Sequence, residues 1–486
     1  SIIVLADAVG SLFVGRITDG LKCKYGRRRP VLLFSAFVLP LIFCLLFLTG
    51  PAGLGSKDAG TVGSIIVLAD AVCSLFVGRF TDGLKCKYGR RRPILLFSAF
   101  VLPLIFSLLF LTVGGSDGQK VVYYTAMGLL FYSFFIMYYV SQMAFGADIS
   151  DGYDDSIKMN SVVSFITNLG TLACLAMPLP VIKLLQSRGM TPSGSWSAFT
   201  AGMSAIVCFG LLFCWNETRG REKLGVVDTK SQSWSEMLSD YKELLQIKPY
   251  RRLIETKFIL NFCYTMYSSS MVFFITYCVG GDSEWITSLA FTFNTVLGFA
   301  VIPIVTGIAL KLGKRRMTVI TALFYGLAAV ALYFLGIHSI PFLLLYVFVH
   351  SVGVHGFWQL YSTNLYDVAD LDEYRSGRRR EGNIVGLQSF ICGFSVSLTV
   401  RVMTLLLDRA GFDGSAAAQS PQALNMLSVC FILLPGIASI AGAASMYLYK
   451  VEREGHLLVK EALARRAAGE APLNEDETAE IEAMFR

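Results

Sequence analysis

The chain has 486 residues, of which 54% are hydrophobic and only 16% are charged, and its formal net charge is +7. An ordinary soluble domain carries about 25% charged residues, so this composition excludes a soluble enzyme, a nucleic-acid-binding domain and a disordered chain. Many apolar runs approach the ~20 residues that a helix needs to cross a ~30 Å hydrocarbon core. Because lipid cannot satisfy open backbone groups, these runs predict an all-α, polytopic membrane protein. The 11 cysteines form no CxxC pair, so neither a metal site nor a disulfide framework is expected.

An internal repeat opens the chain. Residues 1–50 recur as residues 64–113 with five differences. So close a copy indicates a recent duplication rather than the degenerate repeats of ancient transporters. No other first helix is recognisable, so we expect span 31–49 of the duplicated hairpin to stand in for helix 1. Residues 2–15 would then be surplus, since a helix of that length covers only about 21 Å.

A long polar loop divides the later spans into two bundles. We expect spans at 61–79, 94–113, 121–146, 160–184, 197–216, 253–279, 286–310, 317–337, 341–366, 383–407 and 423–449. The predicted domains are the duplicated helix hairpin at 1–63, an N-terminal helix bundle at 64–216, a cytoplasmic linker at 217–252, a C-terminal helix bundle at 253–450 and a cytoplasmic tail at 451–486. Within the linker, Ser233–Ile247 predicts an amphipathic surface helix. The charged tail predicts a solvated helix.

The loop charges predict the orientation in the membrane. One alternate set of loops holds 29 lysines and arginines, whereas the opposite set holds four: Lys57, Lys120, Arg188 and Arg409. Cytoplasmic loops of membrane proteins carry this excess of positive charge. The basic loops and the C-terminal tail are therefore predicted to be cytoplasmic.

Two loops carry a motif of membrane transporters. Loop 78–93 repeats loop 15–29 and combines a glycine, an aspartate four residues later (Asp82) and a Gly-Arg-Arg-Arg cluster that includes Arg90 and Arg91. This pattern resembles the helix 2–3 loop of the major facilitator superfamily. Asp82 can sit near the start of the following helix or pair with a facing arginine. The resemblance implies that these residues help to latch a cytoplasmic gate.

The end of the run at 341–366 carries the more specific signature. It reads Phe-Trp-Gln-Leu at 357–360, then Tyr-Asp-Val-Ala-Asp-Leu-Asp-Glu-Tyr at 366–374 and Gly-Arg-Arg-Arg-Glu-Gly at 377–382. These residues resemble the helix 10–11 signature of the glycoside-pentoside-hexuronide:cation symporters, a branch of the major facilitator superfamily. The resemblance implies two six-helix bundles that move a sugar or a related solute together with a sodium ion or proton. It also implies that Asp367, Asp370, Glu373 and Arg380 form ion pairs at the cytoplasmic gate, and that Arg375 matches a cavity-facing cation.

Ionisable residues inside the spans are the candidate coupling site. A charge at the bilayer centre is costly and usually marks a pathway or a pair. Asp70, with its copy Asp7, lies near the middle of a span and resembles the first carboxylate of the family's ion motif. Ser74 stands where that motif has a second carboxylate, which favours protons over sodium as the coupling ion.

Polar and aromatic residues at helical spacing are the candidate substrate site. His355, Trp358 and Gln359 fall on one helical face that could line a cavity. Tyr139 and Gln142 continue a similar stripe on the span at 121–146. Neutral histidine hydrogen bonding and aromatic core packing are the alternative interpretations of the two faces.

We therefore expect a secondary active transporter, most simply a carbohydrate:cation symporter that works by alternating access. A lipid-like or amino-acid solute and a non-transporting product of a rearranged gene are the alternatives. The sequence has no P-loop or HExxH motif, which argues against an ATP-driven pump and an enzyme. No cofactor is expected apart from the coupling ion, H+ or Na+. The expected partners are a small-molecule solute and the lipid bilayer but no nucleic acid, for a monomer in the plasma membrane or an organelle membrane.

Overall fold

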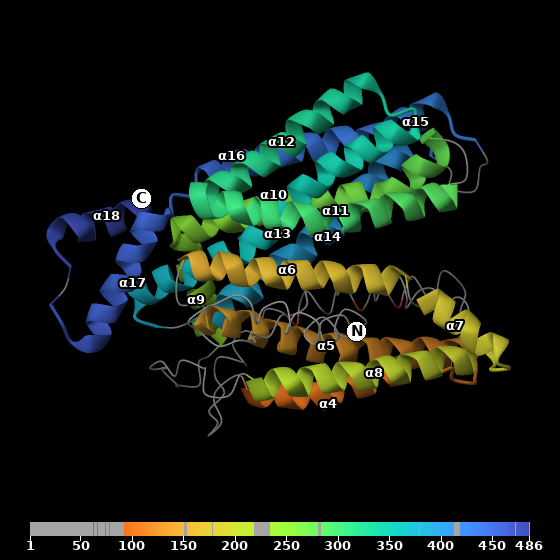
Figure 1. The fold of residues 1–486 in the computed structure, drawn as a ribbon, viewed down its shortest axis with the longest axis horizontal. Helices are drawn as coiled ribbons and strands as arrows, with labels where there is room; N and C mark the ends of the chain where they lie inside the picture. Colours follow the sequence, from red (N-terminus) through yellow and green to blue (C-terminus); the bar gives the residue numbers. More distant parts are fainter. Residues whose placement is uncertain are drawn as a thin grey trace. The chain divides into compact units, whose positions relative to one another are not determined.

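The computed structural model describes residues 62, 66, 73, 77, 92–149, 153–176, 178–217, 234–279, 283–378, 380–412, 418–471 and 473–485. In these residues every regular element is helical (Figure 1). Among the described residues, eight helices are long and apolar enough to cross a membrane. The prediction of an all-α, polytopic membrane protein is confirmed.

The chain divides into two compact units, which are described separately. The first holds α4 (Arg92–Leu109), α5 (Asp117–Ile149), α7 (Pro178–Ser187) and α8 (Pro192–Glu217). The second holds α9 (Trp234–Gln246), α10 (Lys248–Phe274) with the π-helix η1 (Ile275–Val279), α11 (Ser283–Leu312), α12 (Lys314–Leu335), α13 (Ile340–Ser376), α15 (Pro421–Ser428), the π-helix η2 (Val429–Leu433), α16 (Leu434–Tyr447), α17 (Arg453–Ala468) and α18 (Glu475–Phe485). Two helices are shared: α6 (Tyr153–Ala176) belongs to the second unit up to Ser161, and α14 (Glu381–Arg409) belongs to the first up to Phe390.

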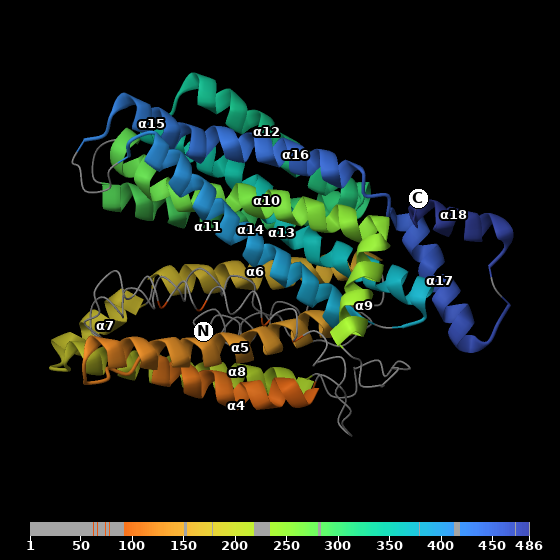
Figure 2. The ribbon, with the colours of Figure 1, turned by 180° about the vertical axis from the view of Figure 1, so that it is seen from behind.

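In the first unit, α4 packs along both α8 and α5 (Figures 1 and 2). The Ser107 hydroxyl donates a hydrogen bond to Ser204 Oγ at 2.7 Å, and the Phe110 ring stacks on Trp196 at 6.1 Å. The expected span at 160–184 is two helices, because α7 begins at Pro178, whose ring cannot continue the preceding helix.

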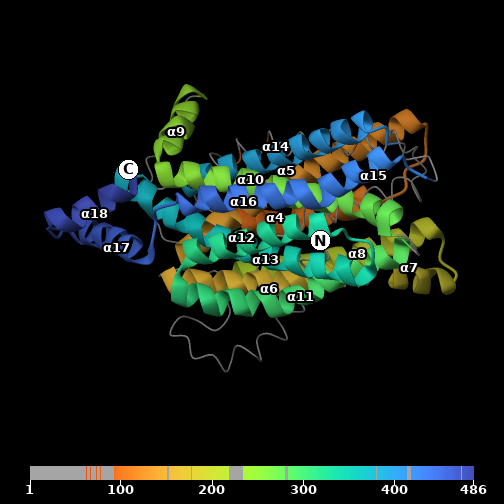
Figure 3. The same cartoon turned by 90° about the horizontal axis from the view of Figure 1, so that it is seen from above.

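In the second unit, α12 packs along both α13 and α16, and α11 packs along α13 (Figure 3). The approach of α12 to α16 is very close, since a Cβ added at Gly326 would lie 2.8 Å from the carbonyl oxygen of Gly436. Small residues allow such backbone contacts between membrane helices. Proline near the first position starts α10, α13, α15 and α16, where its missing N–H is tolerated.

α13 extends ten residues beyond its expected end. The 366–374 signature is therefore helical, and α13 ends at Gly377, whose φ of +68° suits a residue without a Cβ. α9 confirms the amphipathic helix predicted in the linker and lies across the start of α10 (Figure 3). The prediction of a solvated tail is wrong for α17 and α18, because Val459 and Ile481 are fully buried against the end of the unit.

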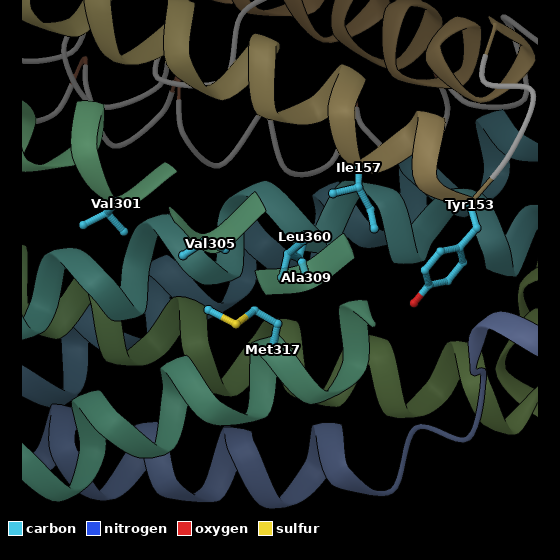
Figure 4. Close-up of a cluster of buried hydrophobic side chains, with 7 residues drawn as sticks. All are labelled: Tyr153, Ile157, Val301, Val305, Ala309, Met317 and Leu360. Atoms are coloured by element: carbon cyan, nitrogen blue, oxygen red, sulfur yellow. The ribbon is translucent and has the colours of Figure 1, made fainter. Parts of the chain in front are cut away.

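One apolar cluster joins the start of α6 to α11, α12 and α13. Its members are Tyr153, Ile157, Val301, Val305, Ala309, Met317 and Leu360 (Figure 4). The Tyr153 hydroxyl accepts a hydrogen bond of 2.8 Å from the backbone N–H of Lys314. This packing fixes the first turns of α6 beside the polar residues described next.

Candidate functional site

Six of the predicted site residues lie outside the described part of the chain. They are the coupling candidates Asp7, Asp70 and Ser74 and the gate candidates Asp82, Arg90 and Arg91. The hairpin at 1–63, including span 31–49, lies there too, except for Val62. These assignments remain predictions.

Tyr139 and Gln142 lie on α5 in the first unit. Tyr139 is buried, and its ring stacks on Phe135 at 6.4 Å, which in turn stacks on Phe131. Gln142 has a buried Oε1 that meets no hydrogen-bond donor among the described residues. The aromatic members of the stripe thus pack on one another.

Gln359 of α13 forms hydrogen bonds with residues of α6 and α11. It is 1% exposed, and its Nε2 donates to Ser161 Oγ of α6 at 2.7 Å and to Thr306 Oγ1 of α11 at 2.5 Å. The Thr306 hydroxyl lies 2.6 Å from Ser161 Oγ. The amide therefore ties the first turns of α6 to α11.

Trp358 faces α10. The Nζ atom of Lys257, a residue of α10 that is fully buried, lies 3.3 Å from the centroid of the Trp358 ring. The same ammonium lies 4.5 Å from the ring centroid of Tyr361 and 5.3 Å from that of Phe357. Three aromatic rings of α13 thus surround one cation inside a membrane span.

The two histidines of α13 lie farther toward its beginning. His350 is 5% exposed and stacks on Tyr267 at 3.5 Å, and neither of its ring nitrogens has a hydrogen-bond partner among the described residues. His355 is half-buried, and its Nε2 likewise meets no partner there.

A buried ion pair joins α12 to α13 at the end that the loop charges assign to the cytoplasm. Lys314 Nζ lies 2.8 Å and 2.9 Å from the two carboxylate oxygens of Asp367, and it donates to the carbonyl oxygen of Thr363 at 3.3 Å. Lys314 is fully buried and Asp367 is 1% exposed. Attraction between the two charges offsets part of the large desolvation penalty of both.

A residue of the tail helix α17 also contacts Asp367 and the neighbouring Asp370. His456, which is 1% exposed, places Nε2 at 2.9 Å from Asp370 Oδ2 and 3.4 Å from Asp367 Oδ1. Lys460 Nζ lies 3.8 Å from the same Asp370 oxygen. We call Lys314, Asp367, Asp370 and His456 the α13 cluster.

A second network holds the linker helix α9. Arg380 binds the carboxylate of Asp372 through two nitrogens, at 2.6 Å and 3.1 Å, and its third nitrogen lies 2.9 Å from both Asp240 and Glu243 of α9. Arg378 binds the same two residues of α9. Burial by itself lowers the pKa of Arg380, but the hydrogen bonds and charge of Asp372, followed by those of Glu243 and Asp240, raise the pKa above its ordinary value. We call these five residues the α9 clamp.

The other two candidates of the signature lie in the last turn of α13. Glu373 is half-buried, and its carbonyl oxygen accepts the hydrogen bond from the Gly377 N–H at 2.9 Å. Arg375 is exposed, and its guanidinium carbon lies 5.7 Å from the ring centroid of Phe485 in α18. Arg375 therefore lies at the surface beside α18 and not beside Trp358 and Gln359, where the resemblance had implied a cavity-facing cation.

Sequence reasoning missed several residues of these sites. Lys257 carried a usable signal, since it is a lone cation next to an uncharged stretch that runs from Phe258 to Val279. His456 and Asp240 carried none, because they lie in charged segments where most such residues face solvent.

Comparisons with known proteins agree with this fold. A family model described as MFS/sugar transport protein matches residues 1–59 and 42–453. The glucuronide carrier protein homolog of Escherichia coli (strain K12) is 26% identical over 414 residues, which cover 82% of this chain and 86% of the relative. The isoprimeverose transporter of Lactiplantibacillus pentosus is 23% identical over 427 residues, 86% of each chain.

Two solved structures share the fold. The fucose:proton symporter of E. coli aligns with a TM-score of 0.58 at 12% identity, covering 90% of this chain and 98% of that one. A proton:xylose symporter of the major facilitator superfamily aligns with a TM-score of 0.55 at 14% identity, covering 93% of this chain and 96% of that one. With the family model spanning most of its length, this multi-pass membrane protein belongs to the MFS/sugar transport family.

Proposed function

We propose that the protein is a carbohydrate:cation symporter that works by alternating access as a monomer in the plasma membrane. Two of its relatives, a glucuronide carrier homolog and an isoprimeverose transporter, support a sugar as the solute. The observation that carries the proposal is the concentration of buried ion pairs at one end of α13.

The α13 cluster and the α9 clamp are suited to a cytoplasmic gate. Both connect α13 to elements that follow or precede the bundle, namely α17 and α9, through charged contacts. Ion pairs can exchange partners or water at little net change in free energy once they become solvated. Ion pairs can therefore stabilise the closed gate without making its opening energetically prohibitive.

The proposed coupling ion is a proton, and Asp70 is its proposed acceptor. A carboxyl buried in a span is costly when ionised, so it favours taking up a proton. The neutral Ser74 leaves one carboxylate where a sodium site would use two. Asp7, the copy in the first repeat, is proposed to be redundant.

Uptake by the purified full chain in proteoliposomes tests this function. An inward proton gradient should drive accumulation of a labelled sugar from a panel of glycosides, pentosides and sugar acids, whereas sodium at fixed pH should add nothing. Asp70→Asn should abolish gradient-driven accumulation but retain exchange, and Asp7→Asn is the matched control that should behave as the wild type.

Absence of accumulation of every sugar under both gradients would contradict sugar symport and favour another solute or a non-transporting product. Stimulation by sodium at fixed pH and membrane potential would replace the proton with sodium. Equal accumulation by Asp70→Asn and the wild type would remove Asp70 from coupling.

A further inference from the structure

The tail helix α17 lies at the end of the second unit and is bound to three of its helices (Figure 1). At its start, Arg453 pairs with Asp154 of α6, and the carboxylate of the preceding residue lies 2.5 Å from the Arg315 guanidinium of α12. Near its end, Arg466 donates a hydrogen bond of 3.2 Å to a backbone carbonyl of α13. The tail therefore connects α6, α12 and α13 at the end that the loop charges assign to the cytoplasm.

His456 is the buried residue among these tail contacts. It is 1% exposed, and its Nε2 lies 2.9 Å from Asp370 Oδ2 and 3.4 Å from Asp367 Oδ1. Because an ionised carboxylate only accepts hydrogen bonds, Nε2 carries the hydrogen of the neutral ring and Nδ1 carries the lone pair. Nδ1 has no hydrogen-bond partner among the described residues. A second proton on this ring would therefore bind at Nδ1.

The surroundings of His456 contain few groups that change charge near neutral pH. The titratable groups of this region are Asp367 and Asp370 of α13, Lys314 of α12, Lys460 of α17, Tyr153 of α6 and Tyr449. Burial raises the pKa of both tyrosines above its ordinary value, so their hydroxyls stay neutral. Aspartate and lysine ordinarily titrate outside the range of about pH 5 to 8, and histidine titrates within it. From α18, the apolar Met484 packs against Gly455, the neighbour of His456.

A proton on His456 would strengthen the hold of α17 on α13. With a neutral ring, the charges of Lys314 and Lys460 balance those of Asp367 and Asp370. A protonated ring adds a positive charge beside both carboxylates, and burial makes this attraction stronger than it would be in water. An opening of the gate that separates Asp367 from Lys314 also has to break the contact between His456 and Asp367.

We propose that α17 is an autoinhibitory latch on the cytoplasmic gate and that a proton on His456 tightens this latch. The proposal rests on the transport and gating function proposed above. A symporter that carries protons inward with its solute acidifies the cytoplasm. The latch would then slow transport as protons accumulate there, which limits further acidification.

Hydrogen exchange of the full chain in detergent tests the pH-dependent contact without any transport. The protection factor of the α17 backbone corrects for the pH dependence of exchange itself. In the wild type it should rise about fivefold to tenfold between about pH 8 and about pH 5.5, because the contact gains a second charge. His456→Gln keeps an N–H donor but cannot become charged, so its protection should not rise. Arg465→Gln, which alters only a local ion pair with Glu461, is the matched control and should follow the wild type.

Sugar exchange in proteoliposomes tests the inhibition. The pH is equal on both sides, so that no gradient drives the exchange, and a labelled sugar that the panel identifies is used. The exchange rate of His456→Gln relative to the wild type should be about one near pH 8 and should rise about fivefold to tenfold near pH 5.5. His456→Lys keeps a positive charge at both pH values and should be slower than the wild type near pH 8.

An equal rise of protection in the wild type and His456→Gln would assign the pH dependence to another group and overturn the role of His456. A ratio of exchange rates that stays constant with pH would overturn the inhibition, even if the protection of α17 changes as expected. Exchange of no sugar by any of the variants is instead the failure of the proposed transport function, and the protection factors then decide by themselves whether a proton on His456 tightens α17.

Discussion

Two lysines are fully buried among the described residues of the second unit, and they are held in opposite ways. Lys314 lies against both oxygens of Asp367, so an opposite charge neutralises it. Lys257 lies among three aromatic rings, whose negative faces attract the ammonium. The contacts of Lys314 form an ion pair, whereas those of Lys257 are cation–π contacts between α10 and α13.

The largest expected difference is in stability. Lys314→Met removes the ammonium that contacts both carboxylate oxygens of the buried Asp367 and should lower the free energy of unfolding by about 3–5 kcal/mol. Lys257→Met removes a cation from an apolar site and should change that free energy by less than about 1 kcal/mol. Thermal unfolding in detergent measures both.

The double variant Lys314→Met/Asp367→Leu sharpens this comparison. Removing both charges should restore most of the lost stability, because replacing a buried ion pair by apolar residues is often neutral. Equal losses from the two single lysine variants would show that the two sites do not differ in the way proposed.

A smaller loss is expected in the α9 clamp. Arg380→Gln leaves Asp372 and Asp240, which are 1% and 3% exposed, without their main cation. We expect a loss of about 2–3 kcal/mol. Arg378→Gln, at a more exposed arginine that binds the same α9 residues, is the matched control and should cost less than about 1 kcal/mol.

The contribution of the α9 clamp to stability should not change with pH near neutrality. The pKa of Arg380 is raised in the folded chain, so its contribution to stability is present below the unfolded pKa and is lost only as the pH rises through the folded one. The pKa of the arginine side chain lies above about 12 in both the folded and the unfolded chain. The stability difference between the wild type and Arg380→Gln should thus be constant from pH 6 to 9, and a steep change there would assign the effect to another group.

The smallest effect is expected in the tail. His456→Ala removes the contact with Asp370 and should loosen α17 by about 1–2 kcal/mol. Arg465→Ala is the control on the same helix, because Arg465 forms an exposed i,i+4 ion pair with Glu461. Hydrogen exchange of the α17 backbone measures the loosening, and identical exchange in the two variants would mean that His456 does not hold the tail.

The candidate substrate face shows how far helical spacing can predict contacts. His355, Trp358 and Gln359 were predicted to share a face, and α13 does place them within about one turn. Adjacent residues of a helix still differ in direction by about 100°, so Gln359 meets α6 and α11 while Trp358 meets α10. Residue spacing predicts the direction of each side chain, but the helix that lies in that direction is decided by packing.

The sequence by itself determined the class of protein, most of the helical spans among the described residues, the linker helix α9 and the transporter family, because hydropathy, loop charge and the 366–382 signature are local properties of the chain. Tertiary structure alone decided that α17 packs on the bundle, that Lys314 pairs with Asp367 across 53 residues and that Lys257 lies among the rings of α13. A charge in a sequence carries no record of its partner, since ion pairs and cation–π contacts form between helices that are distant in the chain. Their geometry exists only after the helices have packed.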